Sequence, residues 1–371
     1  MTERGATLGP GATIGILGGG QLGRMLSVAA SRLGFRCHVY EPAANPPAAD
    51  VAHRTFTAPY EDHEALAQFA KGVDVITYEF ENVPTAALDL LESIVPIRPN
   101  RRALAISQDR LSEKAFLRDL GLATAPFAPV DRAADLDAAL ADIGMPAILK
   151  TRRLGYDGKG QARITAADQA GAALAAMAGA PAILEGFVTF SHEVSVIAAR
   201  GLDGRVACYD PGENVHRDGI LHTTTVPARL SMAQQTDAVI LAGRILNALD
   251  YVGVMGVELF VTPAGLVVNE IAPRVHNSGH WTQNGCVIDQ FEQHIRAVAG
   301  WPLGDGSRHS DIEMLNLIGE DVARVPELAG RADTAIHLYG KAEARPGRKM
   351  GHVNRRLPQP LNAPPMSPRG R

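Results

Sequence analysis

Short apolar runs alternate with amphipathic stretches over the first hundred residues. The apolar runs predict strands at 13–17, 36–41, 51–57 and 73–78. Apolar residues at helical spacing lie between them and predict helices over 21–33 and 62–70. Strands that alternate with helices form a parallel sheet, because each helix returns the chain to the same end of the sheet. We therefore expect residues 1–100 to form an N-terminal Rossmann-like domain with a doubly wound parallel sheet.

From residue 101 onward the pattern is that of mixed α+β structure. It predicts helices over 101–106, 109–120, 166–177 and 231–249, and strands over 146–151, 182–188, much of 193–227, and a hairpin over 252–271. Three further short runs predict a C-terminal β unit at 312–318, 335–339 and 352–354. We expect a central domain over 101–305 with a mobile lid at about 125–190, a C-terminal β-rich domain over 306–355, and a disordered proline-rich tail over 356–371.

Composition excludes several classes of protein. No window approaches the ~18 consecutive apolar residues of a membrane span, and the first ten residues lack the apolar core of a signal peptide. The three cysteines are far apart, so neither a disulfide framework nor a zinc cage is expected. A net charge of −4 provides no basic field for nucleic acid. We expect a cytoplasmic protein that acts on small molecules, without a membrane or nucleic-acid partner.

Lysine is rare in this chain, since only six of the 36 basic residues are lysines. Four of them accompany the motifs described below, and they are Lys150, Lys159, Lys341 and Lys349. Lys71 and Lys114 lie outside these motifs. The four lysines predict a local anion-binding cleft that the overall negative charge conceals.

A glycine-rich turn follows the first predicted strand. Gly18, Gly20 and Gly23 satisfy the GxGxxG spacing, and Glu41 ends the next strand where a ribose-binding acid would stand. Glycines at this place let the backbone approach an anion at a helix N-terminus, so any phosphorylated ligand fits. A nicotinamide-dependent oxidoreductase and a plain tight turn both remain open on this motif alone.

A second glycine-dense loop follows the strand that ends at Lys150. Gly155, Gly158 and Gly160 surround Lys159, which is typical of a flap that closes over phosphates, although the Walker A spacing is absent. An exposed flexible turn is the alternative. Downstream, the strand edge at 185–188 would present backbone groups to an adenine, and Glu193 would accept from ribose hydroxyls.

The hairpin over 252–271 carries two glutamates. A three-residue loop at 263–265 pairs Glu258 directly with Glu270 on one face, whereas a loop one residue shorter would put them on opposite faces. Paired carboxylates in apolar strands favour Mg²⁺ or Mn²⁺, since neither Cys nor His accompanies them. A solvated sheet face is the alternative. By strand alternation Asn269 should face away from Glu270, unless the strand is bulged or Asn269 acts indirectly.

Cationic and polar side chains follow the hairpin. The loop 273–280 is rich in hydrogen-bond donors, and a basic group lies near the end of the chain. Arg274, Lys341 and Arg348 together would hold a phosphate. Scattered surface charge is the alternative for each of them singly.

Taken in order, these motifs resemble the ATP-grasp superfamily, and within it the 5-(carboxyamino)imidazole ribonucleotide synthases. The resemblance rests on GGGQLGRM (18–25), YEFENV (78–83), GYDGKGQ (155–161), GENVHRDGI (212–220), NEIAPRVHNSGHWT (269–282) and GRKMGHVN (347–354). It implies an ATP-grasp fold of α/β and α+β class, ATP and Mg²⁺ (or Mn²⁺) as cofactors, and a homodimer. The implied reaction is ATP- and bicarbonate-dependent carboxylation of the exocyclic amine of 5-aminoimidazole ribonucleotide, through carboxyphosphate, in purine biosynthesis.

The resemblance also implies roles by position. The implied ATP-binding residues are Arg110, Lys150, Gly155, Tyr156, Asp157, Gly158, Lys159, Gly160, Gln161, Glu185, Gly186, Phe187, Val188, Glu193, His216, Asn269 and Glu270. The implied ribonucleotide-binding residues are Gln21, Leu22, Glu79, Tyr156, Asp157, Arg274, His276, Asn277, Ser278, Lys341, Arg348 and Lys349. Glu258 and Glu270 match the metal ligands, and the residues implied in catalysis are Lys159, Asp157, Glu79 and Arg274.

Four other functions stay open at this stage. The nearest is the ATP-grasp formyltransferase that uses formate to make formyl glycinamide ribonucleotide, and biotin carboxylase is more distant. A nicotinamide-dependent dehydrogenase rests on residues 18–41 alone, and a non-enzymatic nucleotide sensor has no motif of its own.

Overall fold

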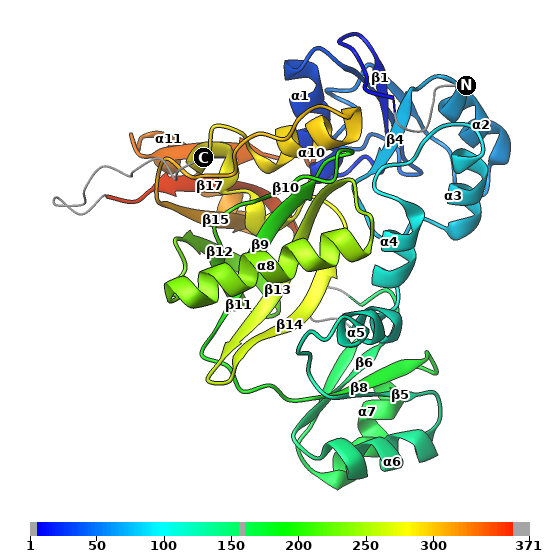
Figure 1. Cartoon of the computed structure of the whole chain (residues 1–371), viewed down its shortest axis with the longest axis vertical. Coiled ribbons are helices and arrows are strands. Elements are labelled where there is room, and N and C mark those ends of the chain that lie inside the picture. The colour runs from blue at the N-terminus through cyan, green and yellow to red at the C-terminus, as the bar shows by residue number, and fades with distance from the viewer. Residues whose placement is uncertain (1–5, 156–159, 359–371) are drawn as a thin grey trace.

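The computed structural model describes residues 6–155 and 160–358, and its N-terminal part is a four-stranded parallel sheet (Figure 1). The strand order is β3-β2-β1-β4. In chain order the elements are β1 (Thr13–Leu17), α1 (Gln21–Arg32), β2 (Arg36–Tyr40), β3 (Arg54–Phe56), α2 (His63–Lys71), β4 (Val75–Tyr78), α3 (Thr85–Glu92) and α4 (Arg101–Ser107). The predicted strand at 51–57 is shorter than expected, since only its centre pairs with β2.

Both faces of this sheet are covered, which explains why its strands read as continuous apolar runs. On one face, Leu26 and Ala30 of α1 pack with Ile14 and Val39 in a core that also includes residues of the later helix α10. On the other face, α2 and α3 bury their apolar side chains against β4. The sheet thereby holds the glycine-rich turn after β1 and the end of β4 side by side at one edge.

The next part of the chain forms a second four-stranded sheet, which is antiparallel and has the order β5-β8-β6-β7. Its elements are α5 (Arg110–Asp119), β5 (Phe127–Val130), α6 (Ala133–Ile143), β6 (Ala147–Thr151), β7 (Gln161–Ile164), the short helix η1 (Ala167–Gln169), α7 (Ala170–Ala176) and β8 (Ala182–Gly186). Helices α6 and α7 share a core with this sheet. Figure 1 shows the unit at the bottom of the molecule, below the central sheet.

The largest sheet follows the order β14-β13-β9-β11-β12-β15-β17-β16, with β10 paired to β9. Its elements are β9 (His192–Arg200), β10 (Val206–Cys208), β11 (Gly212–Arg217), β12 (Ile220–Val226), α8 (Met232–Ala248), β13 (Gly253–Thr262), β14 (Gly265–Ala272), η2 (Asn277–Gly279), α9 (Thr282–Gly285), α10 (Gln290–Ala299), β15 (Ile312–Ile318), η3 (Gly319–Arg324), α11 (Val325–Ala329), β16 (Thr334–Leu338) and β17 (Lys349–Arg356). The C-terminal strands therefore continue the central sheet, because β15 pairs directly with β12.

Helix α8 covers one face of the central sheet (Figure 1). A capping box of Ser231 and Gln234 starts the helix, and Leu241, Ile245 and Leu246 pack with the strands β9 and β13. Each large apolar side chain buried here contributes about 1.5–3 kcal/mol. Among the described helices none is long and apolar enough to cross a lipid bilayer.

Candidate active site

One cavity of about 720 Å³ opens where the three sheets approach one another. Its walls come from the end of β4, the N-terminus of α1, helix α5, strands β6 and β7, and the strands β9, β11, β13 and β14. It brings together most of the residues predicted from the sequence, namely Gln21, Leu22, Glu79, Arg110, Lys150, Gly155, Gln161, Glu193, His216, Glu258, Asn269, Glu270, Arg274, His276, Asn277, Lys341 and Lys349.

The remaining predicted residues lie elsewhere. Tyr156, Asp157, Gly158 and Lys159 lie outside the described residues. Several described residues are not part of the cavity wall, and they are Gly160, Glu185, Gly186, Phe187, Val188, Ser278 and Arg348. Two of these still touch residues of the wall, since Glu185 pairs with Lys150 and Ser278 bonds His276.

The hairpin of β13 and β14 pairs Glu258 with Glu270, as predicted, but the predicted loop is wrong. The turn has two residues rather than three, because Thr262 pairs with Gly265. That turn alone would place the two glutamates on opposite faces. A bulge between Glu258 and Leu259 inserts Asn269 as an extra residue on β14 and restores the pairing.

The bulge also explains why the adjacent residues Asn269 and Glu270 lie on the same face of the strand. Asn269 and Glu270 both line the cavity, and Asn269 Nδ2 lies 3.5 Å from Glu258 Oε2. In a regular strand neighbouring side chains point to opposite sides. Glu258, Asn269 and Glu270 therefore form one cluster of two carboxylates and an amide in the cavity wall.

The pKa values of the two carboxyl groups are shifted in opposite directions. Burial and the neighbouring charge of Glu270 raise the pKa of Glu258 to about 7. Burial alone would raise the pKa of Glu270 as well, but the charge of Arg110, whose Nη1 lies 3.0 Å from Glu270 Oε2, lowers it overall. Within 6–155 and 160–358 no group of three or more His, Cys, Asp and Glu side chains is arranged to hold a metal. Two carboxylates with a shared amide suit a hard cation that takes its other ligands from phosphates and water.

A buried ionic cluster supports the lid side of the cavity. Lys150 Nζ donates to Glu185 Oε2 at 2.9 Å, and Lys114 Nζ lies 3.5 Å from the same oxygen. Both partners of the second pair are almost fully buried. Lys114, which no sequence motif marked, does not line the cavity but supports its wall through Glu185. Its position on a predicted helix gave no sign of burial, because the partner Glu185 comes from a strand far along the chain.

The glutamate before Lys114 was also missed by the sequence analysis. Glu113 Oε1 accepts the backbone N–H of Ile271 at 2.6 Å. Burial and the charge of Glu270 raise the pKa of Glu113 to about 8. Glu113 lines the cavity beside the hairpin cluster. No sequence motif includes Glu113. The only feature of the sequence that could have drawn attention to it is the rare lysine beside it, Lys114.

His276 is oriented by a chain of hydroxyls. Ser195 Oγ donates to Ser278 Oγ at 2.7 Å, and Ser278 Oγ lies 2.8 Å from His276 Nδ1. The backbone N–H of Ser278 also donates to Nδ1, so Nδ1 is an acceptor and the neutral ring carries its proton on Nε2. Burial and the charge of Arg274 hold the pKa of His276 well below its usual value. Nε2 lies 3.6 Å from Glu258 Oε1.

His216 faces the cavity beside Glu193. Its Nδ1 lies 3.0 Å from Glu193 Oε2. Burial opposes the charged ring, but hydrogen bonding and the negative charge of Glu193 outweigh it and raise the pKa of His216. The pair keeps the Glu193 carboxylate in place at the edge of the cavity.

The glycine-rich turn is occupied by protein carboxylates. Glu79 accepts the backbone N–H groups of Gly20, Leu22 and Gly23 at 2.6, 3.1 and 3.0 Å, and Glu41 accepts that of Gly19 at 2.8 Å. These are the amides that would bind a dinucleotide pyrophosphate. Dinucleotide binding at this turn would therefore displace two carboxylates, so the turn does not support the nicotinamide alternative.

The opposite end of the cavity carries the cationic group. Arg274 Nη2 pairs with Glu81 at 2.7 Å, a partner that the sequence analysis did not identify. Lys341 Nζ donates to Gln21 Oε1 at 2.5 Å and to the carbonyl of Lys349 at 2.6 Å. These contacts tie the C-terminal strands to the N-terminus of α1. Arg348 is directed elsewhere, since its Nη1 donates to the carbonyl of Glu343.

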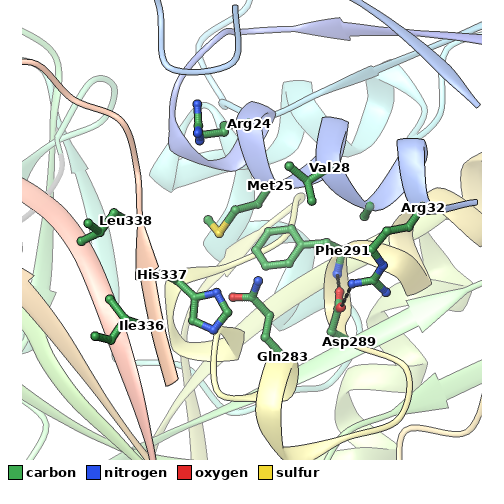
Figure 2. A pocket seen from close by; sticks show the side chains of 11 residues that line it. Arg24, Met25, Val28, Arg32, Gln283, Asp289, Phe291, Ile336, His337 and Leu338 are labelled. Carbon is green, nitrogen blue, oxygen red and sulfur yellow. Dashed lines mark hydrogen bonds and ion pairs between the residues drawn. The ribbon is translucent and has the colours of Figure 1, made fainter. Parts of the chain in front are cut away.

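A second cavity, of about 250 Å³, lies between α1 and the strand β16 (Figure 2). Its charged side chains are already paired, Arg32 with Asp289 at 3.2 Å and Arg24 with Asp50 at 3.0 Å. The described residues that were predicted to form the site do not line it. We therefore assign the candidate active site to the larger cavity.

Three family models match consecutive parts of the chain. They describe a ribonucleotide synthetase preATP-grasp domain over 11–108, an ATP-grasp domain over 115–291, and a phosphoribosylaminoimidazole carboxylase C-terminal domain over 313–359. The N5-carboxyaminoimidazole ribonucleotide synthase of Brucella melitensis is 56% identical over 358 residues, which cover 96% of this chain and 99% of that protein. The chain belongs to this family of ATP-grasp ligases.

Solved structures of the family have the same fold. The N5-carboxyaminoimidazole synthetase of Staphylococcus aureus, complexed with ADP, is 36% identical with a TM-score of 0.91, over 96% of each chain. The synthase of Aspergillus clavatus, in complex with ADP and 5-aminoimidazole ribonucleotide, is 34% identical with a TM-score of 0.88, over 94% of each chain. The ATP-grasp fold expected from the sequence is thereby confirmed.

Proposed function

We propose that this chain is the ATP-dependent ligase that carboxylates the exocyclic amine of 5-aminoimidazole ribonucleotide with bicarbonate. The observation that carries this proposal is the convergence of two residue groups on one cavity. Arg110, Lys150 and Glu193 lie toward the lid, whereas Arg274 and Lys341 belong to the opposite, cationic end. The hairpin carboxylates also line this cavity, where a phosphoryl group would have to pass from one substrate to the other.

The nucleotide site is proposed on the lid side. Lys150, paired with Glu185, supplies positive charge for phosphates. Glu193, held by His216, accepts from ribose hydroxyls. The segment 185–188 was expected to be a free strand edge, but β8 lies between β5 and β6, and the N–H groups of Gly186 and Phe187 donate to the carbonyls of Pro126 and Pro146. We therefore propose a backbone contact with adenine only at Val188, after the strand ends. Lys159, which lies outside the described residues, would add a further cation for the phosphates.

Glu258 and Glu270 fit a Mg²⁺ ion, with Mn²⁺ as a substitute, because two facing carboxylates with Asn269 beside them offer hard oxygen ligands. When bound, such an ion neutralises charge on the nucleotide phosphates. Arg110 keeps Glu270 ionised before the ion arrives. His276 Nε2 lies 3.6 Å from Glu258 Oε1, beside the other carboxylate of the pair.

Bicarbonate is a poor electrophile, so it must be activated. One of its oxygens attacks the γ-phosphorus of ATP, the bond to ADP breaks, and carboxyphosphate forms. The amine of the ribonucleotide then attacks the carboxyl carbon, directly or as carbon dioxide released in the closed site, and inorganic phosphate leaves. Arg274, at the cationic end of the cavity, neutralises charge on the transferred phosphoryl group.

Two carboxylates remain candidates for the amine proton. Both oxygens of Glu79 already accept backbone amides, which favours a positioning role for it. Asp157, which lies outside the described residues, is then the preferred base. Lys341 and Lys349, which line the cavity, would hold the ribonucleotide phosphate, whereas Arg348, which donates to the carbonyl of Glu343, would not.

The test is phosphate release from ATP in the presence of aminoimidazole ribonucleotide, with bicarbonate added or removed. Release that depends on both compounds supports the proposal. Release that depends on formate and glycinamide ribonucleotide instead would identify the formyltransferase. Binding of NAD without binding of ATP would restore the dehydrogenase alternative. We also propose that the enzyme acts as a homodimer in the cytoplasm, which sedimentation and cell fractionation would test.

A further inference from the structure

Helix α5 lies along the outer edge of β14, the last strand of the central sheet. Backbone groups at that edge have no strand partner, and the segment that starts with α5 supplies partners for them. Lys114 Nζ donates to the carbonyl of Asn269 at 2.7 Å, and Glu113 Oε1 accepts the N–H of Ile271 at 2.6 Å. One turn earlier, Arg110 Nη1 donates to Glu270 Oε2 at 3.0 Å. Three side chains on one face of α5 therefore form hydrogen bonds with residues 269, 270 and 271.

These contacts fall on the bulge that aligns the proposed metal ligands. Without the extra residue the two-residue turn would pair Glu258 with Asn269, and Glu270 would face away from the cavity. A bulge leaves local backbone groups without ladder partners, so the strand needs other bonds to retain it. Lys114 and Glu113 supply such bonds on both sides of Glu270.

Both side chains are buried, which strengthens their hold on the backbone of β14. The residues Glu113 and Lys114 are 2% and 1% exposed. A buried polar side chain that is hydrogen-bonded to the backbone fixes that backbone strongly, since losing the bond leaves a buried polar group unsatisfied. Surface side chains at the same positions would not impose the register of the strand.

We propose that Glu113 and Lys114 are positioning residues that hold the β14 bulge, and through it turn Glu270 and Asn269 toward the same ligand as Glu258. This inference rests on the proposed function in that it takes these three residues as the metal site. Neither Glu113 nor Lys114 touches the metal or the nucleotide in this account. Their effect passes through the backbone of residues 269–271.

A competing explanation is that Lys114 only balances the charge of Glu185 and so supports nucleotide binding. The two explanations make different predictions. Loss of the bulge weakens metal binding and leaves metal-free nucleotide binding intact. Loss of charge balance at Glu185 weakens nucleotide binding even in the presence of a metal chelator.

The variants are Glu113→Met, Glu113→Gln and Lys114→Met in the full chain, with Lys71→Met as the matched control. Lys71 is exposed at the end of α2. The glutamine keeps an oxygen that accepts from Ile271 without a charge, whereas the methionine cannot accept. We measure Mn²⁺ affinity with saturating ADP by electron paramagnetic resonance, and ADP affinity in EDTA by calorimetry.

Glu113→Met and Lys114→Met should weaken Mn²⁺ binding by about 10- to 100-fold, the usual effect of losing an outer partner of a metal ligand. Glu113→Gln and Lys71→Met should bind Mn²⁺ nearly as the wild type does, and ADP affinity in EDTA should be unchanged throughout. Unchanged Mn²⁺ affinity in both methionine variants would overturn the proposal. So would an equal loss of ADP affinity in EDTA.

Hydrogen exchange provides a readout that does not depend on ligands. Glu113→Met should speed exchange of the Ile271 amide, whereas the Val268 amide, which donates to Ala123 O at 2.8 Å, should stay protected. Equal protection of the Ile271 amide in the variant and in the wild type would contradict the proposed role of Glu113 in holding the bulge. These measurements use no ribonucleotide or bicarbonate. Failure of the proposed carboxylation activity can therefore be distinguished from failure of the proposed role of Glu113 and Lys114.

Discussion

His294 of α10 joins the N-terminal sheet to the central sheet. Its Nδ1 accepts the backbone N–H of Val254 at 3.0 Å, and its Nε2 lies 2.8 Å from Thr77 Oγ1. The ring is fully buried, and burial lowers the pKa of His294 to about 3. Protonation would place a second N–H against that of Val254, so the folded protein keeps this histidine neutral.

The sign of the pH effect follows from proton linkage. Between pH 3 and 6.5 the unfolded chain binds a proton at His294 that the folded chain does not, so folding stability rises with pH across that window. Taking an unfolded pKa of ~6.5 and the folded pKa of about 3, acidification from pH ~7.5 to ~5.0 costs about 2 kcal/mol at this residue. The loss is complete only below the folded pKa.

The assay is urea denaturation at pH ~7.5 and ~5.0, followed by the fluorescence of Trp281 and Trp301, for the wild type and for His294→Gln. The variant is less stable at the higher pH because it loses a buried partner. Its further loss on acidification should be smaller than that of the wild type by about 2 kcal/mol. Equal losses in the two proteins would refute the assignment of His294 as a buried neutral histidine.

Four further substitutions test other parts of the molecule. Glu270→Gln should abolish turnover and leave the circular dichroism spectrum unchanged, since it removes one proposed metal ligand; near wild-type activity would refute that assignment. Gly23→Ala should destabilise the fold by about 1–3 kcal/mol in thermal melts, because the new Cβ would lie 2.6 Å from the backbone carbonyl of Gly18. Gly171→Ala, with open space around it, should stabilise the fold by about 0.5–1 kcal/mol. Stabilisation by both substitutions would show that helix propensity, and not the close contact, decides the effect at Gly23. Ser195→Ala should lower kcat several-fold and leave the KM for ATP unchanged, because it breaks the hydroxyl chain to His276; a change in KM alone would contradict the role in orienting that ring.

The layout of strands and helices was predictable because it depends on local pattern. The parallel sheet follows from alternating runs, and the long helix α8 from its apolar spacing and its capping box. The C-terminal β unit was also predicted and a family model matches it, but its attachment to the central sheet through the pairing of β15 with β12 was not predicted. Which strand a short apolar run pairs with is decided by tertiary contacts.

The hairpin illustrates the limit more sharply. The pairing of Glu258 with Glu270 was predicted correctly from a loop that was one residue too long, and the bulge compensated for the error. A bulge has no simple sequence signal, because here it is stabilised by a helix more than a hundred residues earlier in the chain. The burial of Lys114 and the capping of the glycine turn by Glu79 were hidden for the same reason.

The central claim is that ATP activates bicarbonate as carboxyphosphate before the amine is carboxylated. Turnover with ¹⁸O-labelled bicarbonate tests it most directly, because the oxygen that attacks the γ-phosphorus stays with that phosphorus when the carbon–oxygen bond breaks. The account predicts one ¹⁸O atom in each inorganic phosphate released, measured by mass spectrometry. Phosphate without ¹⁸O, formed at the same rate as the carboxylated ribonucleotide, would contradict it.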